Sequence, residues 1–555
     1  MAEEKKQQGF LKGAAVLSVA TILVKFVGIF FSIPLANKLG EAAMGYYNVA
    51  YNLFALFNAA ATAGVPIAMS RMVSAAYTLG RKKQADRIFS VAAWTFSLVG
   101  LLCAGLMYFF HSGFARLMGM SEAKYAIQAL APTVFFCAFM SAVRGYFQGR
   151  SNMLPTAVSQ VIEAVTKLVV GLGLSFYVFD RTGNGALSAA AAIIGVSVSA
   201  GLGALYSLLY KLWYSAREGR QKREERPSEE CDSGKEIFRT LIHLAVPITL
   251  GACFTYFLDS MDGMTVNRSL RSIAGFDEEY TASLVGVWFN TVKLYDLPGG
   301  IIIPLSTSVL PVLTAAFTRG DLPGMEKTIN SVIRMTLLIA IPCTVGFVLF
   351  GNDLAAVMYY SREMSRMWVG RLLGMVSLSV IFNGILYTTN AVLQSMGNVK
   401  RPVLHMIIGG MVKILLNFLL VPIPALNIMG VPISNVLSNL VVAFLNLRLI
   451  RKLVPKTDGV LSTALPLGIS ALIMGAGAWG VNWGLKKLLP MLLGGVLGET
   501  VLRGLILVLT VIAAVVFYFG GTVLLHGLRS DDLRMLPKGD RLVEKLRLQE
   551  GKRFR

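Results

Sequence analysis

Charged residues interrupt several long apolar stretches of this sequence, where an ionised side chain needs either a partner or a water-filled cavity. Lys25 lies in the middle of the first apolar stretch, and Lys293 lies in a later one, three residues before Asp296. At the centre of a bilayer such a charge costs about 2.5–3.5 kcal/mol on insertion scales. A lysine in a wet cavity suits phosphate, because its ammonium presents three donors on a compact charge. Lys25 and Lys293 are therefore the first candidates for binding an anionic group.

Glu163 and Lys167 have two interpretations. They are four residues apart and therefore share one face of a helix. They either line a polar cavity or form a self-contained ion pair with a structural role. A structural, interfacial or surface interpretation also applies to other residues in apolar stretches: Glu499 with Arg503, and His405, which Lys413 and Asn417 follow in the same stretch.

Three aspartates could bind a coupling cation. Asp259 and Asp262 lie about a turn apart near the end of one apolar stretch, and Asp296 follows Lys293. Carboxylate oxygens suit hard cations, so a monovalent cation near Asp259 and Asp262 is one interpretation. Alternatively, these two residues lie at the outer surface and Asp296 balances the charge of Lys293. The sequence predicts no resident metal and no cofactor.

The composition indicates that these residues belong to a membrane protein. Of the 555 residues, 55% are hydrophobic and 15% are charged, and the mean hydropathy is +0.63, whereas ordinary soluble domains carry roughly 25% charged residues. A soluble enzyme, a disordered scaffold and a secreted disulfide-rich domain are thereby excluded. The apolar stretches predict an all-α integral membrane protein with about fourteen transmembrane helices. Their predicted cores are 14–36, 47–70, 89–110, 125–143, 155–178, 187–210, 240–262, 284–316, 328–351, 367–393, 403–424, 430–449, 461–485 and 498–526.

The net charge of +21 is explained by the distribution of basic residues between loops. If the N-terminus is cytoplasmic, the predicted inside segments hold 36 Lys and Arg residues and the outside segments hold 10. This bias predicts an even number of spans with both termini in the cytoplasm. It also argues against a nucleic-acid partner, because the excess of positive charge follows the membrane topology.

A long polar connection after six predicted spans divides the chain into two halves. It is rich in both signs of charge, which is typical of a solvated linker. Gly64-Val65-Pro66 and Val309-Leu310-Pro311 end corresponding helices in the two halves, which favours two parallel six-helix repeats. The predicted parts are an N-terminal lobe over 1–212, a cytoplasmic linker over 213–239, a C-terminal lobe over 240–456, two further helices over 457–526 and a basic cytoplasmic tail over 527–555.

Nucleotide-binding motifs do not explain the function. The sequence contains no Gly-x-x-x-x-Gly-Lys-Ser/Thr phosphate-binding loop. A match to the dinucleotide fingerprint over 475–480 lies inside an apolar helix with no preceding strand, so it is discarded. By contrast, Pro298-Gly299-Gly300 places a helix breaker beside Lys293 and Asp296, which predicts a bend at this point.

Three segments of the chain resemble one family of transporters. The signature of stage V sporulation protein B-like and MurJ-type flippases is similar to Arg144-Gly145-Tyr146-Phe147-Gln148-Gly149 together with the segment from Met153 to Glu163. The end of the second helix in that group resembles the segment from Ala63 to Arg71, and its eighth helix resembles Lys293-Leu294-Tyr295-Asp296-Leu297-Pro298-Gly299-Gly300. The resemblance covers essentially the whole chain. It implies the multidrug/oligosaccharidyl-lipid/polysaccharide (MOP) exporter superfamily, with two six-helix lobes around a central cavity.

The resemblance implies a flippase and not an enzyme. MurJ-type members move lipid II, an undecaprenyl-diphosphate-linked peptidoglycan precursor, from the inner to the outer leaflet by alternating access. Lys25 and Lys293 then match cavity arginines of the family and would hold the diphosphate, with Arg71 or Arg144 at the inner mouth. The last two helices would line a groove for the lipid tail. Coupling to Na⁺, H⁺ or the membrane potential is expected, and the potential supplies about 2.3 kcal/mol per charge per 100 mV.

The sequence also departs from the family pattern. Phe31-Ser32 and Ala55-Leu56 replace charged pairs of some flippases, which favours the Gram-positive branch and makes Arg71, Arg144 and Lys167 candidates for the missing charge. The expected location is the plasma membrane, and the expected partners are the lipid-linked glycan, membrane lipids and cell-wall synthesis proteins. Two alternatives stay open: a cation-coupled multidrug exporter, and an intramembrane prenyl-diphosphate transferase, for which Asp259-Ser260-Met261-Asp262 resembles half of a magnesium-binding motif.

Overall fold

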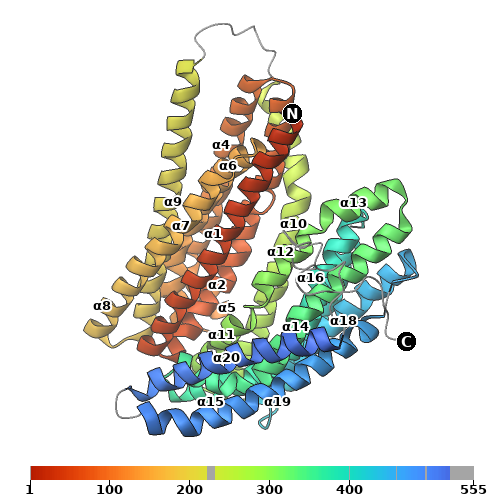
Figure 1. Cartoon of the computed structure of the whole chain (residues 1–555). Coiled ribbons are helices and arrows are strands. Elements are labelled where there is room, and N and C mark those ends of the chain that lie inside the picture. The colour runs from red at the N-terminus through yellow and green to blue at the C-terminus, as the bar shows by residue number, and fades with distance from the viewer. Residues whose placement is uncertain (1, 222–231, 399, 458, 494–496, 526–555) are drawn as a thin grey trace. The chain divides into compact units, whose positions relative to one another are not determined.

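The computed structural model describes residues 2–221, 232–398, 400–457, 459–493 and 497–525, and their regular structure consists of helices alone (Figure 1). The predicted all-α fold class is confirmed. Contacts divide the chain into two compact units, Met1–Gly286 and Val287–Arg555, and each is described by itself.

The first unit is a bundle of long helices arranged around α6. Two π-helical turns interrupt it, one over Lys167–Gly171 between α7 and α8 and one over Ser269–Ile273 after α10. Its helices are α1 (Ala2–Leu39), α2 (Glu41–Thr62), α3 (Val65–Thr78), α4 (Lys82–Phe109), α5 (His111–Leu117), α6 (Lys124–Gly149), α7 (Leu154–Thr166), α8 (Leu172–Thr182), α9 (Gly185–Gln221), α10 (Gly234–Arg268) and the beginning of α11 (Glu278–Tyr295).

The span formed by α2 and α3 is interrupted at Gly64. A Cβ atom at Gly64 would lie 2.3 Å from the carbonyl oxygen of Ala245 on α10, so a larger residue would push the helices apart. The backbone N–H of Gly64 donates to Oγ1 of Thr249, 3.1 Å away. Pro66 lies in the first turn of α3, where its missing N–H removes no intrahelical hydrogen bond. This motif therefore forms the junction at which α10 packs.

α6 is the central helix of the first unit and packs against α2, α3, α4 and α9. Gly145 and Gly149 face α3, where a Cβ atom would lie 2.6 Å from Cβ of Met69 or 2.7 Å from the carbonyl oxygen of Ser70. Tyr146, between these glycines, is fully buried. The end of α6 thus combines close helix contact with a buried aromatic residue, and this contact fixes the position of the chain before α7.

The second unit is arranged around α14, which packs against α15, α16, α19 and α20. Leu337, Leu393 and Ala471, which are 0% exposed, belong to its hydrophobic core. Besides the end of α11, its helices are α12 (Gly299–Ser308), α13 (Leu310–Arg319), α14 (Leu322–Met358), α15 (Glu363–Val376), α16 (Leu378–Ser395), α17 (Lys400–Leu420), α18 (Gly430–Leu453), α19 (Val460–Leu493) and α20 (Glu499–Leu524).

Most of the fourteen predicted membrane spans coincide with long apolar helices. Within the described residues, 11 helices are long and apolar enough to cross a membrane, or 12 if α15 and α16, which are bent by 49°, form one span. The span predicted over 284–316 is divided into α11, α12 and α13. Pro298, Pro304 and Pro311 each lack a backbone donor, which disfavours one continuous helix. The bend predicted beside Lys293 is confirmed, because α11 ends at Tyr295 and a turn follows.

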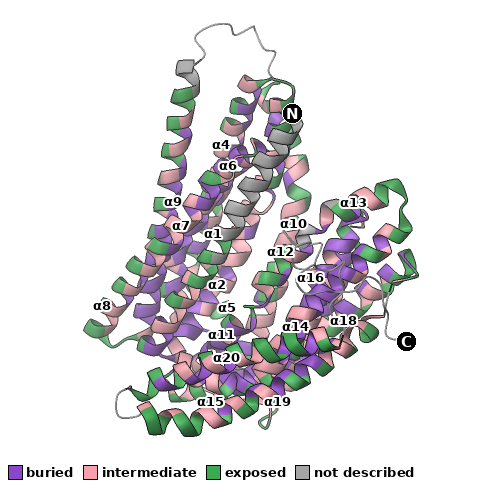
Figure 2. Cartoon of the chain, viewed as in Figure 1, coloured by how far each residue is buried: buried purple, intermediate pink, exposed green. Residues whose placement is uncertain are grey.

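The outward surfaces of both units are apolar, as expected for helices in lipid. Buried residues lie inside each unit, and exposed residues cover the outer faces of the helices (Figure 2). Large apolar side chains are among the exposed residues on α4, α9, α19 and α20, for example Trp94, Leu209, Leu472 and Val516. Together with the length of the helices, this surface indicates a multi-pass membrane protein.

Two helices enter the segment predicted as a cytoplasmic linker over 213–239. α9 continues to Gln221, and α10 begins at Gly234, where Ser233 and Glu236 form a reciprocal capping box. The residues between 222 and 231 lie outside the described residues, as does the predicted tail over 527–555. α10 packs against α2, α3 and α4. The contacts divide the chain after Gly286, and the predicted lobe boundaries stay a prediction.

Candidate functional site

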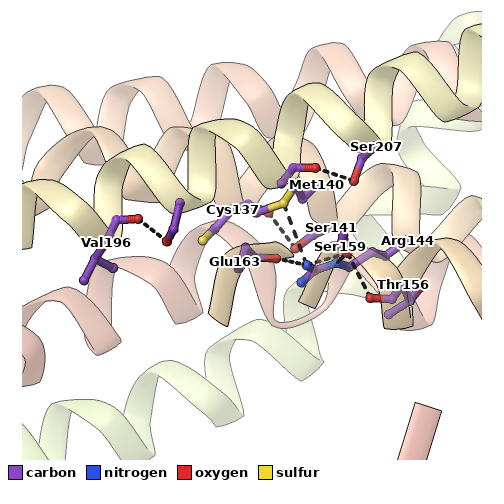
Figure 3. A network of polar contacts seen from close by, with 11 residues as sticks. Cys137, Met140, Ser141, Arg144, Thr156, Ser159, Glu163, Val196 and Ser207 are labelled. Atoms are coloured by element: carbon purple, nitrogen blue, oxygen red, sulfur yellow. Dashed lines mark hydrogen bonds and ion pairs between the residues drawn. The ribbon is translucent and has the colours of Figure 1, made fainter. Parts of the chain in front are cut away.

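Arg144 on α6 contacts two side chains of α7 (Figure 3). Its Nε and Nη2 atoms donate to Oγ of Ser159 at 3.1 and 2.8 Å, and Nη2 also forms an ion pair with Glu163. Sδ of Met140 lies 3.8 Å from Nη2. The side chains of Arg144 and Glu163 are only 20% and 24% exposed. The ion pair is therefore largely shielded from water, so that loss of either partner would leave a poorly solvated charge.

Neighbouring groups hold both ends of this ion pair. Ser159 is buried and donates its hydroxyl hydrogen to the carbonyl oxygen of Thr156 at 2.9 Å, so its oxygen accepts from Arg144. On α9, Gly203 leaves room for Glu163, because a Cβ atom there would lie 2.8 Å from Cγ of Glu163. Three helices thus position one guanidinium and one carboxylate. We name the residues Arg144, Ser159 and Glu163 the α6–α7 polar site.

Lys167 does not form the self-contained pair with Glu163 that was one interpretation of the sequence. Its Nζ atom lies 3.3 Å from the hydroxyl oxygen of Tyr51, and 4.7 and 5.3 Å from the ring centroids of Phe31 and Tyr51. Glu163 is bound by Arg144 from the neighbouring helix instead. Helical spacing could not reveal the pairing of Arg144 with Glu163, because the two residues are 19 positions apart and lie on different helices.

The π-helical turn begins at Lys167 and ends at Gly171. A π turn places one additional residue in the helix and often marks a functional site. Gly171 contacts α9 closely, since a Cβ atom at Gly195 would lie 2.3 Å from Cα of Gly171. Sequence periodicity gave no signal for this turn. It places Lys167 at the point where the span changes its helical geometry.

Lys25 on α1 and Arg71 on α3 are both exposed in the first unit. Within the described part of the chain, neither has a hydrogen bond or an ion pair. Arg144, by contrast, is engaged by Glu163. The structure therefore brings Arg144 and Glu163 together, whereas Lys25 and Arg71 stay predicted ligand-binding residues.

Asp259 and Asp262 lie on α10, the first exposed and the second partly buried. Ser260 between them donates to the carbonyl oxygen of Tyr256 at 2.9 Å and lies 3.3 Å from that of Asn52, so this part of α10 packs on α2. Among the described residues, no three His, Cys, Asp or Glu side chains gather as a metal-binding group. A coupling cation at the two aspartates stays a prediction.

In the second unit, Lys293 and Asp296 lie on either side of the end of α11, and both are exposed. Nζ of Lys293 lies 4.5 Å from the ring centroid of Phe289, one turn earlier. Tyr295 is buried, and its hydroxyl oxygen accepts a hydrogen bond from the side-chain amide of Asn383 on α16. This anchor fixes the end of α11 beside Lys293, whose role in binding an anion stays a prediction.

The other polar residues singled out from the sequence connect helices. His405 on α17 is partly buried, and its Nδ1 atom lies 2.7 Å from Oδ1 of Asn446 on α18. The hydroxyl group of Ser434 donates to Oδ1 of Asn417. Glu499 and Arg503 form an ion pair within α20.

One buried polar cluster was missed by the sequence analysis. Lys211, which directly follows the predicted span over 187–210, has a side chain that is only 8% exposed and pairs with Asp86 at 2.8 Å. Oδ1 of Asp86 also accepts from the hydroxyl group of Tyr146 at 2.9 Å, and Nζ of Lys211 lies 3.9 Å from the ring centroid of Tyr146. Asp86 and Lys211 are 125 residues apart, so no local spacing could reveal the pair.

The sequence of this chain matches a known protein family. Residues 10–317, more than half of the chain, match the family described as "Polysaccharide biosynthesis protein". The chain belongs to this family. Residues 290–419 also match the family described as MatE. The family match covers the α6–α7 polar site, Lys25 and Lys293 alike.

Relatives from Bacillus subtilis (strain 168) agree with this assignment to the polysaccharide biosynthesis protein family. Stage V sporulation protein B is 28% identical over 83% of this chain and 88% of its own length. The uncharacterized membrane protein YabM is 27% identical over 85% of each chain. Lipid II flippase MurJ is 25% identical over 73% of this chain and 76% of its own length.

Solved structures show the same fold. Lipid II flippase MurJ in an inward closed conformation matches with a TM-score of 0.66, 15% identity and coverage of 92% of this chain and 98% of that chain. An inward-facing multidrug resistance MATE family transporter of the MOP superfamily matches with a TM-score of 0.63, 16% identity and coverage of 80% and 100%. The named relatives and solved structures thus include flippases and transporters, which supports the expectation of a transporter rather than an enzyme.

Proposed function

We propose that this member of the polysaccharide biosynthesis protein family is a flippase for an undecaprenyl-diphosphate-linked saccharide, with lipid II as its cargo. The cargo would move from the inner to the outer leaflet of the plasma membrane by alternating access. The observation that carries the proposal is the α6–α7 polar site, whose two helices belong to spans that are long and apolar enough to cross a membrane. Similarity to a lipid II flippase over three quarters of both chains supports the choice of cargo.

Arg144 retains binding capacity although it is paired. Its Nε and Nη2 atoms are engaged by Ser159 and Glu163, while Nη1 makes no hydrogen bond to any described residue. A guanidinium with one free amino group can donate to a phosphate oxygen without breaking its ion pair. We assign Arg144 this auxiliary role, with Lys167 one turn beyond Glu163 contributing charge.

Lys25 and Lys293 are the proposed ligands of the diphosphate. Both side chains are exposed, and neither has an ion pair within the described part of the chain. A lysine ammonium can form three hydrogen bonds to phosphate oxygens. The proposed cycle is driven by the membrane potential, H⁺ or Na⁺, with Asp259, Asp262 and Asp296 as candidate cation ligands. Both termini are proposed to be cytoplasmic, in a Gram-positive plasma membrane.

The test is rescue of lipid II flipping in bacteria depleted of their own flippase. Wild-type protein is expected to restore flipping, whereas Lys25→Ala and Lys293→Ala are expected to reduce it by about tenfold, which corresponds to about 1.4 kcal/mol of lost phosphate binding. Lys487→Ala is the matched control, because Lys487 is an exposed lysine over the ring of Trp483. Lack of rescue by a well-expressed wild-type protein would overturn the proposal.

Two results would redirect the assignment. Normal flipping by both alanine variants would retain the cargo and reject the two lysines as its ligands. Rescue of spore formation without rescue of lipid II flipping would favour another lipid-linked polymer, since the relative named stage V sporulation protein B is as similar as MurJ. Cation-dependent drug efflux without either rescue would favour a multidrug exporter.

A further inference from the structure

A cavity of about 510 Å³ lies inside the second unit, between α14, α19 and α20. Its volume is within the range of about 300–1,000 Å³ that is usual for small-molecule sites. Leu502, Ile506 and Leu507 form an apolar side and are themselves buried. Ala356, Pro490 and Asn482 also line the cavity, so its lining includes apolar surface that suits hydrocarbon.

The other part of the cavity carries two cations and two anions. Nζ of Lys486 on α19 lies 2.7 and 2.9 Å from the two carboxylate oxygens of Asp353 on α14. Arg503 and Glu499 form an ion pair within the first turns of α20. All four side chains line the cavity and are partly exposed. The lining is therefore electrically neutral but strongly polar, which disfavours both a simple anion and a simple cation.

The cavity lies at the level where the apolar spans end. α19 ends at Leu493 and α20 begins at Glu499. Trp483, one turn before Lys487, is exposed, and Nζ of Lys487 lies 3.8 Å from the centroid of its ring. Exposed tryptophan with lysine is typical of the membrane–water interface. An occupant would thus reach polar headgroups at one end and acyl chains at the other.

We propose that this cavity binds a phospholipid whose headgroup carries both a phosphate and a primary ammonium. The phosphate would accept hydrogen bonds from Lys486 and Arg503, and the ammonium would donate to Asp353 and Glu499. This exchange replaces two internal ion pairs by two ion pairs to the ligand, so no charge is left without a partner. The acyl chains would follow the apolar side along Leu502. The proposal is independent of the cargo assigned above.

The chemistry of the lining distinguishes between headgroups. None of the described residues that line the cavity is aromatic. A choline headgroup has no N–H donor and is recognised by aromatic cages, so it would bind poorly. A glycerol headgroup has a phosphate but no cation, and it would leave Asp353 and Glu499 facing a negative charge. An ethanolamine headgroup is therefore the expected ligand.

Native mass spectrometry of the full-length, delipidated protein tests this order. The probes are phosphatidylethanolamine, phosphatidylcholine and phosphatidylglycerol with identical acyl chains. Wild-type protein is expected to retain phosphatidylethanolamine about tenfold more strongly than the other two, because each lacks one of the two charge-assisted contacts. In the double variant Asp353→Asn with Glu499→Gln the cations lose their internal anions, so the preference is expected to change to phosphatidylglycerol.

Two further variants separate lipid binding from damage to the fold. Ala356→Trp fills the cavity without changing its charge and is expected to reduce phosphatidylethanolamine retention by about tenfold. Asp180→Asn removes an exposed ion pair with Lys38 in the first unit and is expected to keep the wild-type pattern. Equal retention of the three lipids by wild-type protein would overturn the proposal. An unchanged preference in both cavity variants would also overturn it, because the retained lipid would then bind elsewhere.

Discussion

The carboxylate of Glu163 on α7 is held by the guanidinium of Arg144 on α6. The two residues belong to one continuous sequence signature, and the turn between α6 and α7 folds the signature back on itself. The contact is more than three quarters shielded from water on both sides. The family signature therefore encodes a physical connection between two helices as well as a polar site in a membrane bundle.

Replacement of either partner of this pair should destabilise the protein more than replacement of both. Arg144→Met or Glu163→Met alone leaves a shielded charge without its partner, which is expected to lower the free energy of unfolding by about 3 kcal/mol. The double variant leaves no such charge and should lose less than either single variant. Unfolding of the detergent-solubilised protein, followed by circular dichroism during denaturant titration, measures this cycle.

The ion pair between Lys38 and Asp180 provides the control for that cycle. It also joins two helices of the first unit, but its side chains are 41% and 59% exposed. Exposed pairs contribute little because water solvates each partner alone. Methionine replacements there should change stability much less than those at Arg144 and Glu163. Additive losses in the Arg144 and Glu163 variants would mean that the contact carries no coupling energy.

Close contact at the π turn should make Gly195 intolerant of a side chain. In Gly195→Ala the new Cβ atom would lie 2.3 Å from the backbone of Gly171, which cannot move without displacing the span. Overpacking of this kind is expected to lower the free energy of unfolding by about 1–3 kcal/mol. Gly173→Ala is the matched control, since no atom lies within 4 Å of the added Cβ. Equal unfolding midpoints for the two variants would contradict the contact.

Much of the fold could be predicted because an apolar stretch of about twenty residues can cross a membrane as an α-helix, which satisfies its backbone hydrogen bonds within the segment. The break after α11 was also predictable, since Pro298 and the glycines that follow disfavour a continuous helix. The division of the predicted 284–316 span into three helices was not anticipated, because hydropathy averages over a proline and does not detect it. Apolar length alone therefore locates this apolar region but not the breaks within it.

The candidate site was predictable only in part. The residue types that disfavour burial in a membrane identified Glu163 and Lys167, and the family resemblance identified Arg144, but helical spacing offered only Lys167 as a partner for Glu163. Spacing describes neighbours on one helix, whereas a bundle brings together residues from different helices. The pair of Asp86 and Lys211 shows the same limit, because each residue lies in a charged segment that resembles a loop.

Tyr51 should matter more for its ring than for its hydroxyl group. Tyr51→Phe removes the hydroxyl group that lies 3.3 Å from Nζ of Lys167 and keeps the ring beside the ammonium. Tyr51→Leu removes both, with an expected cost of about 1 kcal/mol from the lost cation–π contact. In the flippase rescue assay, Tyr51→Phe should resemble wild type and Tyr51→Leu should be slower. Equal defects in both variants would show that the hydroxyl group carries the effect.

The buried cluster of Asp86 and Lys211 should respond asymmetrically to mutation. The Lys211 side chain is 8% exposed, whereas that of Asp86 is 56% exposed. Lys211→Met therefore leaves a carboxylate that water and the hydroxyl group of Tyr146 still solvate, and its expected cost is about 1 kcal/mol. Asp86→Ala removes the carboxylate from a buried ammonium, so its expected cost is larger, about 3 kcal/mol. Denaturant unfolding of the two variants checks this order. The reverse order would mean that Lys211 stabilises the charge of Asp86 more than Asp86 stabilises the charge of Lys211.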